Sequence, residues 1–118
     1  MLTIAVIVFA IGAVGGLVLA SSVLRDRLPS WALSLLHAAL GATGLVLTAI
    51  VVLGPKSANV ASVVTTALVI LVVAALAGFF LASYHARKIS PPNAAVIAHA
   101  GVAVVGFLLL VGGAFHLI

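Results

Sequence analysis

Long apolar runs separated by short polar breaks dominate the chain. Four such runs cover residues 2–24, 31–53, 59–84 and 93–117. Each run reaches the ~20 residues that an α-helix needs to cross the ~30 Å hydrocarbon core of a bilayer. Because only short connections lie between the runs, neighbouring helices are antiparallel and no soluble domain lies between them. The pattern predicts an all-α membrane protein, a bundle of four transmembrane helices.

The second half of the chain repeats the first half at an offset of 62 residues. Fourteen of the fifty-six pairs are identical when residues 1–56 are placed on residues 63–118 without a gap. The matches include rare residues: Ser21 with Ser83, Arg25 with Arg87, Pro29 with Pro91, His37 with His99, and Gly44 with Gly106. Self-similarity at a fixed period is typical of duplicated units. We therefore expect two tandem helical hairpins, residues 1–56 and 57–118, in one compact bundle.

An even number of helices separates the two hairpins, so both insert with the same orientation. This predicts a parallel repeat with a pseudo-two-fold axis along the membrane normal. Arg25 and Arg27 lie in the first connection, Arg87 and Lys88 in the third, and only Lys56 in the second. Since cytoplasmic loops carry the excess of basic residues, we expect connections one and three in the cytoplasm and both termini on the other side.

Composition supports the membrane class and narrows the function. The chain is 66% hydrophobic and 5% charged, has no cysteine, and carries a net charge of +4. Asp26, the only acid, lies in a connection. The chain therefore has no intramembrane carboxylate of the kind that proton-coupled transporters use. The sequence contains no hydrolase-like Ser/His/Asp set and no phosphate-binding loop, and it leaves no surface for nucleic acid. We expect no catalytic site of the chain's own, and we attribute the basic charge to topology and to anionic lipid head groups.

Two histidines occupy equivalent places on the second and fourth apolar runs. His37 and His99 each stand about seven residues into their run, which places both imidazoles ~10 Å inside the hydrocarbon boundary. Ionisable side chains at such depths usually face the interior of a bundle. We therefore expect the two imidazoles at the same depth, facing the centre.

Small residues follow each histidine on the same helix face. Gly41 and Gly44 stand four and seven residues after the first histidine, and Ala103 and Gly106 stand at the same spacings after the second. Such residues leave room for a planar macrocycle, and one axial imidazole from each hairpin suits the iron of a haem. The sequence thus predicts a single haem b with His37 and His99 as its metal ligands. Gly44 and Gly106 are equally compatible with tight helix packing.

Polar residues near the same end of the hairpins suit the haem propionates. Arg25 and Arg87 supply guanidinium groups, which bind carboxylates well. Ser21 and Ser83, one turn deeper, add hydroxyl groups. Ser34 stands three residues before the first histidine, where we expect it to orient that ring.

Other small and polar residues have plainer interpretations. Stripes of small residues on the first and third runs are typical of close helix packing: Gly12, Gly16 and Ala20, and Ala74, Gly78 and Ala82. His85 and His116 have no histidine at the equivalent positions and stand near helix ends, so we expect both at the membrane interface and no second bis-histidine haem.

The architecture is similar in outline to four-helix b-type membrane cytochromes, in which histidines on transmembrane helices ligate haem. That resemblance implies a small electron-transfer protein, or a haem-bearing subunit with other membrane redox subunits as partners in the bilayer. The alternative is a non-catalytic accessory subunit in which the histidines form interhelical hydrogen bonds. A chlorophyll does not explain two histidines, and the few hydroxyl side chains are too scattered to define the polar path of a channel. Oligomeric state is left open.

Overall fold

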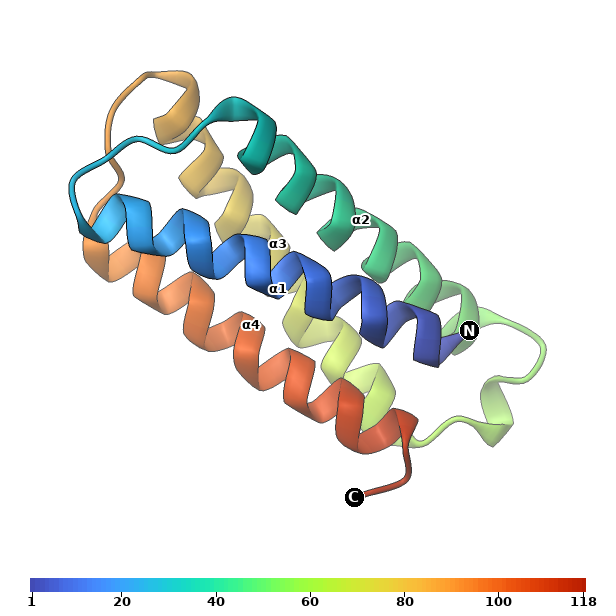
Figure 1. The fold of residues 1–118 in the computed structure, drawn as a ribbon. Coiled ribbons are helices and arrows are strands. Elements are labelled where there is room, and N and C mark those ends of the chain that lie inside the picture. Colours follow the sequence, from blue (N-terminus) through green and yellow to red (C-terminus); the bar gives the residue numbers. More distant parts are fainter.

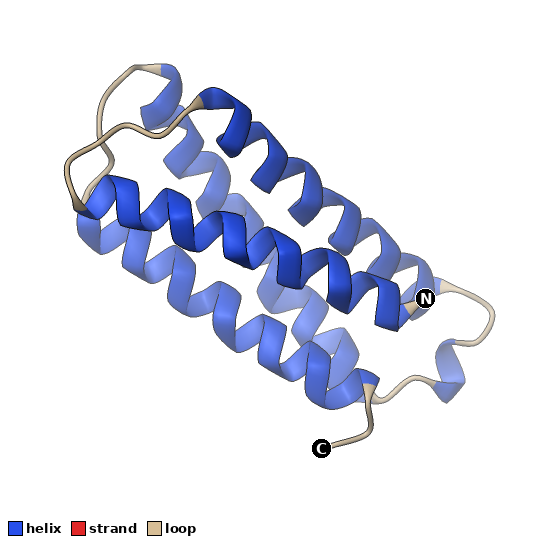
Figure 2. Cartoon of the chain, viewed as in Figure 1, coloured by secondary structure: helices blue, strands red, loops and turns tan.

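A computed structural model describes residues 1–118 as helices joined by short connections (Figure 1). The helices are α1 (Leu2–Leu24), α2 (Trp31–Leu53), α3 (Ser62–Ala86) and α4 (Asn93–Ala114), with one 3-10 turn, η1 (Ser57–Asn59), between α2 and α3. The chain forms no strand (Figure 2). The expected all-helical architecture is confirmed.

All four helices are long and apolar enough to cross a membrane. In each helix an 18-residue window has a mean hydropathy between 2.1 and 2.7. The helices are 22 to 25 residues long, and a helix of that length spans ~35 Å. Large apolar side chains point outward on every helix; Leu17, Leu53 and Phe79 are 68%, 82% and 70% exposed. Such a surface belongs in lipid, as expected for a multi-pass membrane protein.

The helices pair as two hairpins whose partners are adjacent in sequence. α1 packs most extensively on α2, and α3 on α4, while α2 also touches α3 and α1 also touches α4. Neither α1 and α3 nor α2 and α4 pack directly, so α2 and α4 lie diagonally across the bundle (Figure 1). The bundle measures 45 × 22 × 19 Å. The hairpins are therefore joined along two seams, α2–α3 and α1–α4.

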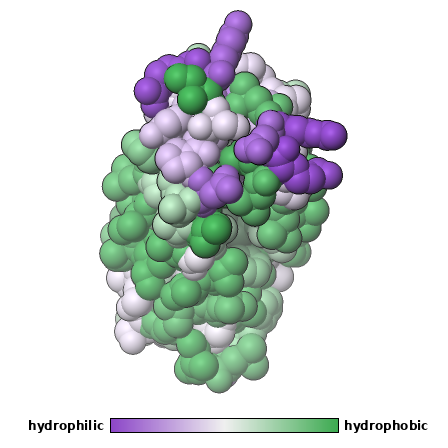
Figure 3. All heavy atoms as spheres, turned by 90° about the vertical axis from the view of Figure 1, so that its left-hand side faces the viewer, coloured by the Kyte–Doolittle hydropathy of each residue, from purple (hydrophilic) through white to green (hydrophobic).

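The two ends of the bundle differ in chemistry. The connections α1–α2 and α3–α4 lie together at one end, here called the basic end because it carries Arg25, Arg27, Arg87 and Lys88 (Figure 1). Both termini and η1 lie at the other end, the terminal end (Figure 1). Figure 3 shows hydrophilic residues gathered at one end above apolar flanks. The chain thus has the profile of a bundle that lies across a bilayer.

The best-packed part of the interior lies toward the terminal end. Val64, Ala67 and Leu71 of α3 and Leu110 of α4 form a cluster of buried apolar residues. Thr48 of α2 is also fully buried, and its hydroxyl donates to the carbonyl of residue 44 on its own helix at 2.8 Å. The histidines of α2 and α4 lie on the basic side of this cluster.

Three helix boundaries differ from the sequence-based expectation. α3 ends at residue 86 rather than 84, just before the left-handed residue Lys88. α3 begins at residue 62 rather than 59, because η1 and the extended backbone of Val60 precede it. α4 ends at residue 114 rather than 117, because His116 adopts a left-handed conformation with φ of 55°. α2 begins where expected, and Ser30 caps it by accepting a hydrogen bond from the Leu33 amide at 3.2 Å.

α1 and α3 end with the same backbone turn. Asp26 and Lys88, 62 residues apart, have φ of 58° and 55°. The amides that follow fold back onto the last helical turn: Arg27 donates to the Ser22 carbonyl at 2.8 Å and Ile89 to the Tyr84 carbonyl at 3.0 Å. Glycine usually occupies this left-handed position, because a side chain is strained there.

Lys88→Gly should therefore stabilise the protein by about 1 kcal/mol, because glycine adopts positive φ without strain. The matched control is Lys88→Ala, which removes the same charge but keeps a Cβ at the strained position. Thermal unfolding in detergent measures both variants. Equal unfolding midpoints for the glycine and alanine variants would contradict the prediction.

Candidate functional site

The two histidines on the diagonal helices each make one hydrogen bond across their own hairpin. Nδ1 of His37 lies 2.8 Å from the carbonyl oxygen of Gly12 on α1. Nδ1 of His99 lies 2.8 Å from the carbonyl oxygen of Ala74 on α3. A carbonyl oxygen only accepts, so Nδ1 carries the hydrogen in both rings and donates it. In a neutral imidazole this leaves Nε2 with a lone pair in both rings.

Glycines on the facing helices make these contacts possible. A Cβ added to Gly16 would lie 2.8 Å from Cε1 of His37, and a Cβ added to Gly78 would lie 3.2 Å from Cε1 of His99. A side chain would overlap the His37 ring at residue 16 and would crowd the His99 ring at residue 78, so glycine at both places suits this close approach. Both glycines belong to the small-residue stripes expected to serve helix packing, and their identity at equivalent positions in the two hairpins is a signal for this role.

The two imidazoles meet between the hairpins. Their ring centroids are 6.3 Å apart, and their planes cross at 86°. Both side chains are half-buried. Each ring makes its one hydrogen bond through Nδ1, and Nε2 of neither ring has a hydrogen-bond partner in the chain. The arrangement thus combines two fixed tautomers with two lone pairs that no protein donor uses.

The four small residues predicted to leave room for a macrocycle differ in their surroundings. Gly41 has open space where a Cβ would point, and Ala103 is half-buried. Gly44 and Gly106 are covered instead: an added Cβ would lie 2.7 Å from the Phe9 ring and 2.9 Å from the Leu71 side chain, respectively. The latter two glycines therefore pack against side chains of α1 and α3, about two helical turns from the imidazoles.

The predicted polar residues lie at the basic end, and their hydrogen bonds stay within their own helix ends. Nε of Arg25 donates to the Ser21 carbonyl at 3.1 Å, and Nε of Arg87 donates to the Ser83 carbonyl at 3.2 Å. The hydroxyls of both serines donate to carbonyls three residues earlier. Arg87 also lies over the Tyr84 ring, 4.5 Å from its centroid. Neither arginine forms a hydrogen bond with a histidine.

Ser34 does not contact His37, contrary to the sequence-based expectation. Its hydroxyl is hydrogen-bonded to Nδ1 of His85 at 2.8 Å. The carbonyl of Gly12 orients His37 in its place. His85 itself is 7% exposed, so it is buried against α2 rather than spread on the surface. His116 is exposed at the terminal end.

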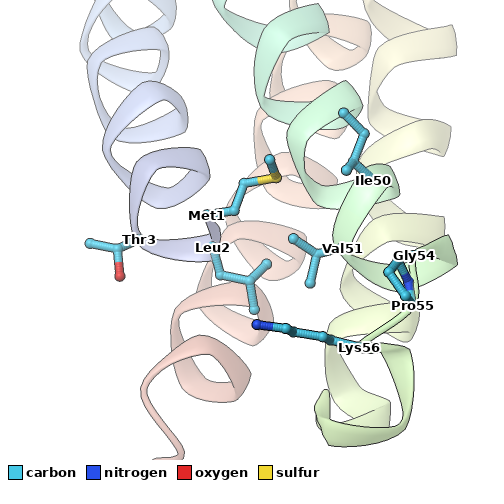
Figure 4. A pocket seen from close by; sticks show the side chains of 8 residues that line it. All are labelled: Met1, Leu2, Thr3, Ile50, Val51, Gly54, Pro55 and Lys56. Carbon is cyan, nitrogen blue, oxygen red and sulfur yellow. The ribbon is translucent and has the colours of Figure 1, made fainter.

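Other potential binding features are weaker. No group of three or more His, Cys, Asp or Glu side chains converges anywhere in the chain. An apolar groove of about 430 Å³ lies between α1 and α4. A second pocket of about 490 Å³ lies at the terminal end, where Lys56 extends toward the start of α1 (Figure 4). The paired imidazoles therefore remain the candidate site, because their Nε2 atoms have lone pairs that could bind a metal.

Comparisons of the chain with protein-family models, with curated proteins and with solved structures found no match.

Gly16→Ala should destabilise the protein by about 1–3 kcal/mol, because the new methyl group overlaps the His37 ring. Gly41→Ala is the matched control, since nothing lies within 4 Å of an added Cβ there. Thermal unfolding in detergent should show a lower midpoint for the first variant and no loss for the second. The packing account fails if the two variants unfold alike.

Proposed function

We propose that the chain is a small b-type membrane cytochrome that binds one haem between His37 and His99. The observation that carries this proposal is the pair of imidazoles, each donating through Nδ1 to a backbone carbonyl and each keeping a partnerless Nε2. A backbone carbonyl that holds the far nitrogen of a histidine is the common support of a metal-ligating imidazole.

The spacing of the rings fits a shared metal. A metal–imidazole bond is ~2 Å long, so two imidazoles on opposite sides of one metal have ring centroids on the order of 6 Å apart. The observed separation is 6.3 Å. Two protein ligands alone are too few for a bare structural metal ion, which usually takes four. They suit a metal whose other positions a tetrapyrrole fills, and this supports haem over a free ion.

The surroundings assign roles to further side chains. Gly41 and Ala103, one turn from the imidazoles, would flank the macrocycle. Phe9, which packs on Gly44, and Leu71, which packs on Gly106, would close the haem site toward the terminal end. These apolar residues would exclude water from the site.

Arg25 and Arg87 are stronger candidates than Ser21 and Ser83 for binding the haem propionates. Arg25 donates to the chain only through Nε, so its terminal nitrogens are free, and Arg87 adds one weak contact of 3.4 Å to the Ser83 hydroxyl. The hydroxyls of Ser21 and Ser83 already donate to backbone carbonyls. Guanidinium groups bind carboxylates with two parallel hydrogen bonds, so they would also set the orientation of the macrocycle.

Bound haem would supply one-electron redox chemistry, and the protein would supply binding and orientation. With His37 and His99 both bound to it, the haem iron would have no open position for a substrate. We therefore propose electron transfer, alone or as a haem-bearing subunit of a membrane redox complex. No catalytic site of the chain's own is part of this proposal.

We also propose that the two hairpins are a tandem duplication related by a pseudo-two-fold axis along the membrane normal. Support comes from contacts that recur 62 residues apart: histidine to carbonyl, ring to glycine, and arginine to serine carbonyl. The basic end would face the cytoplasm, with both termini on the other side.

A non-catalytic scaffold is the second candidate, and two observations favour it. Both histidines form the interhelical hydrogen bonds that this alternative expects, from α2 to α1 and from α4 to α3. The perpendicular arrangement of the rings at 6.3 Å also lies within the range of an edge-to-face aromatic pair. In that case the histidines only join the hairpins, and the protein is colourless.

A reduced-minus-oxidised visible spectrum of the purified protein, titrated with haem in detergent, separates the two candidates. We expect a low-spin b-type spectrum for the wild type. His37→Ala and His99→Ala should lose that spectrum and bind haem at least ~10- to 100-fold more weakly, the cost of losing even an outer partner of a metal ligand. His116→Ala, a histidine change at the exposed terminal end, is the control and should match the wild type. A colourless wild type would contradict the cytochrome and leave the scaffold.

A further inference from the structure

His85 stands in the last turn of α3 and touches α2 in two ways. Its ring stacks on the Trp31 ring, with centroids 4.1 Å apart and planes 15° apart. Its Nδ1 is hydrogen-bonded to the Ser34 hydroxyl at 2.8 Å. The His85 side chain is 7% exposed, whereas Trp31, which covers one face of its ring, is 46% exposed.

The contact between His85 and Ser34 is the only side-chain hydrogen bond that joins the two hairpins. The histidine–carbonyl bonds run within a hairpin, and every backbone hydrogen bond outside the helices is local. Apolar helices in lipid gain no hydrophobic energy from contact with one another, so an interhelical hydrogen bond carries more weight in fixing their relative position.

The contact acts on the part of α2 that carries the site. Trp31, Ser34 and His37 follow one another at spacings of three residues, so they lie along one side of α2. His85 holds the first two of these residues, and His37 comes one turn deeper. The last turn of α3 is thus tied directly to the stretch of α2 that positions one imidazole.

The other seam lacks this contact. At the positions 62 residues from His85 and Ser34 stand Val23 and Val96, which are 7% and 6% exposed. The residue equivalent to Trp31 is Asn93. The α1–α4 seam therefore has two buried valines where the α2–α3 seam has its hydrogen bond.

We propose that His85 is a positioning residue for the paired imidazoles: through Trp31 and Ser34 it fixes α2, and with it His37, relative to the hairpin that carries His99. The role of the pair as haem ligands rests on the proposed function. The mechanical role of His85 does not. The contact also makes the two halves of the site inequivalent, since only one histidine-bearing helix is held in this way.

The test compares His85→Val with His116→Val, the same substitution at the exposed terminal end. Valine already occupies the buried equivalent position 23, so it suits a seam of this bundle. Because the chain has no cysteine, spin labels can be attached at Leu36→Cys and Ile97→Cys. These exposed sites on α2 and α4 lie beside the two histidines. The distance between the labels is measured in lipid nanodiscs without haem.

We expect the distance distribution to broaden or lengthen in His85→Val and to stay unchanged in His116→Val. Ser34→Val should give the same direction of change, because it removes the hydrogen bond and keeps the stacked rings. Fluorescence of Trp31, the only tryptophan, should rise in His85→Val because a stacked imidazole that quenches it is lost. An unchanged distance distribution in His85→Val would overturn the proposal.

Haem titration of the same variants separates this proposal from the proposed function. If the wild type binds haem, His85→Val should raise the dissociation constant several-fold and His116→Val should not. Equal constants for the wild type and His85→Val would overturn the positioning role while leaving the cytochrome intact. A colourless wild type would contradict the cytochrome, and the label distances would still decide the role of His85.

Discussion

The structure depends on one constraint: an imidazole placed in the membrane interior must use its N–H group. In both hairpins the solution is a hydrogen bond from Nδ1 to a carbonyl on the facing helix, at Gly12 for His37 and at Ala74 for His99. Water is absent at this depth, so an unused donor would be costly. The bond therefore fixes the tautomer and the ring orientation, and it fixes how closely the two helices of a hairpin approach.

Several other features follow from that bond. Gly16 and Gly78 leave space for the ring to approach the facing helix, most clearly at Gly16. Since α2 and α4 are diagonal, the two oriented rings meet between the hairpins with Nε2 atoms that no donor satisfies. The core packs most tightly toward the terminal end, around Leu71. The half-buried imidazoles lie outside this cluster.

Much of the fold was predictable from the sequence, because hydropathy alone defines spans in a membrane protein. Boundaries differ where local backbone geometry intervenes, as at η1 before α3 and at the left-handed residues after α3 and α4. Contacts between helices were less predictable. Ser34 was expected beside His37 from its spacing on one helix, but His85 of another helix binds it. Gly16 resembled a packing residue. A small residue that lets two helices pack closely cannot be told from the sequence apart from one that makes space for a ring.

Nitrogen-15 NMR of the histidine side chains in the cofactor-free protein tests the central claim most directly, because it reports which ring nitrogen carries the hydrogen. The account predicts that both His37 and His99 are protonated on Nδ1 and carry a lone pair on Nε2, as the hydrogen bonds to Gly12 and Ala74 require. Assignments come from the His37→Ala and His99→Ala variants. Protonation of either ring on Nε2 alone would contradict the hydrogen bond from its Nδ1. That Nε2 would then have no lone pair to donate to a metal.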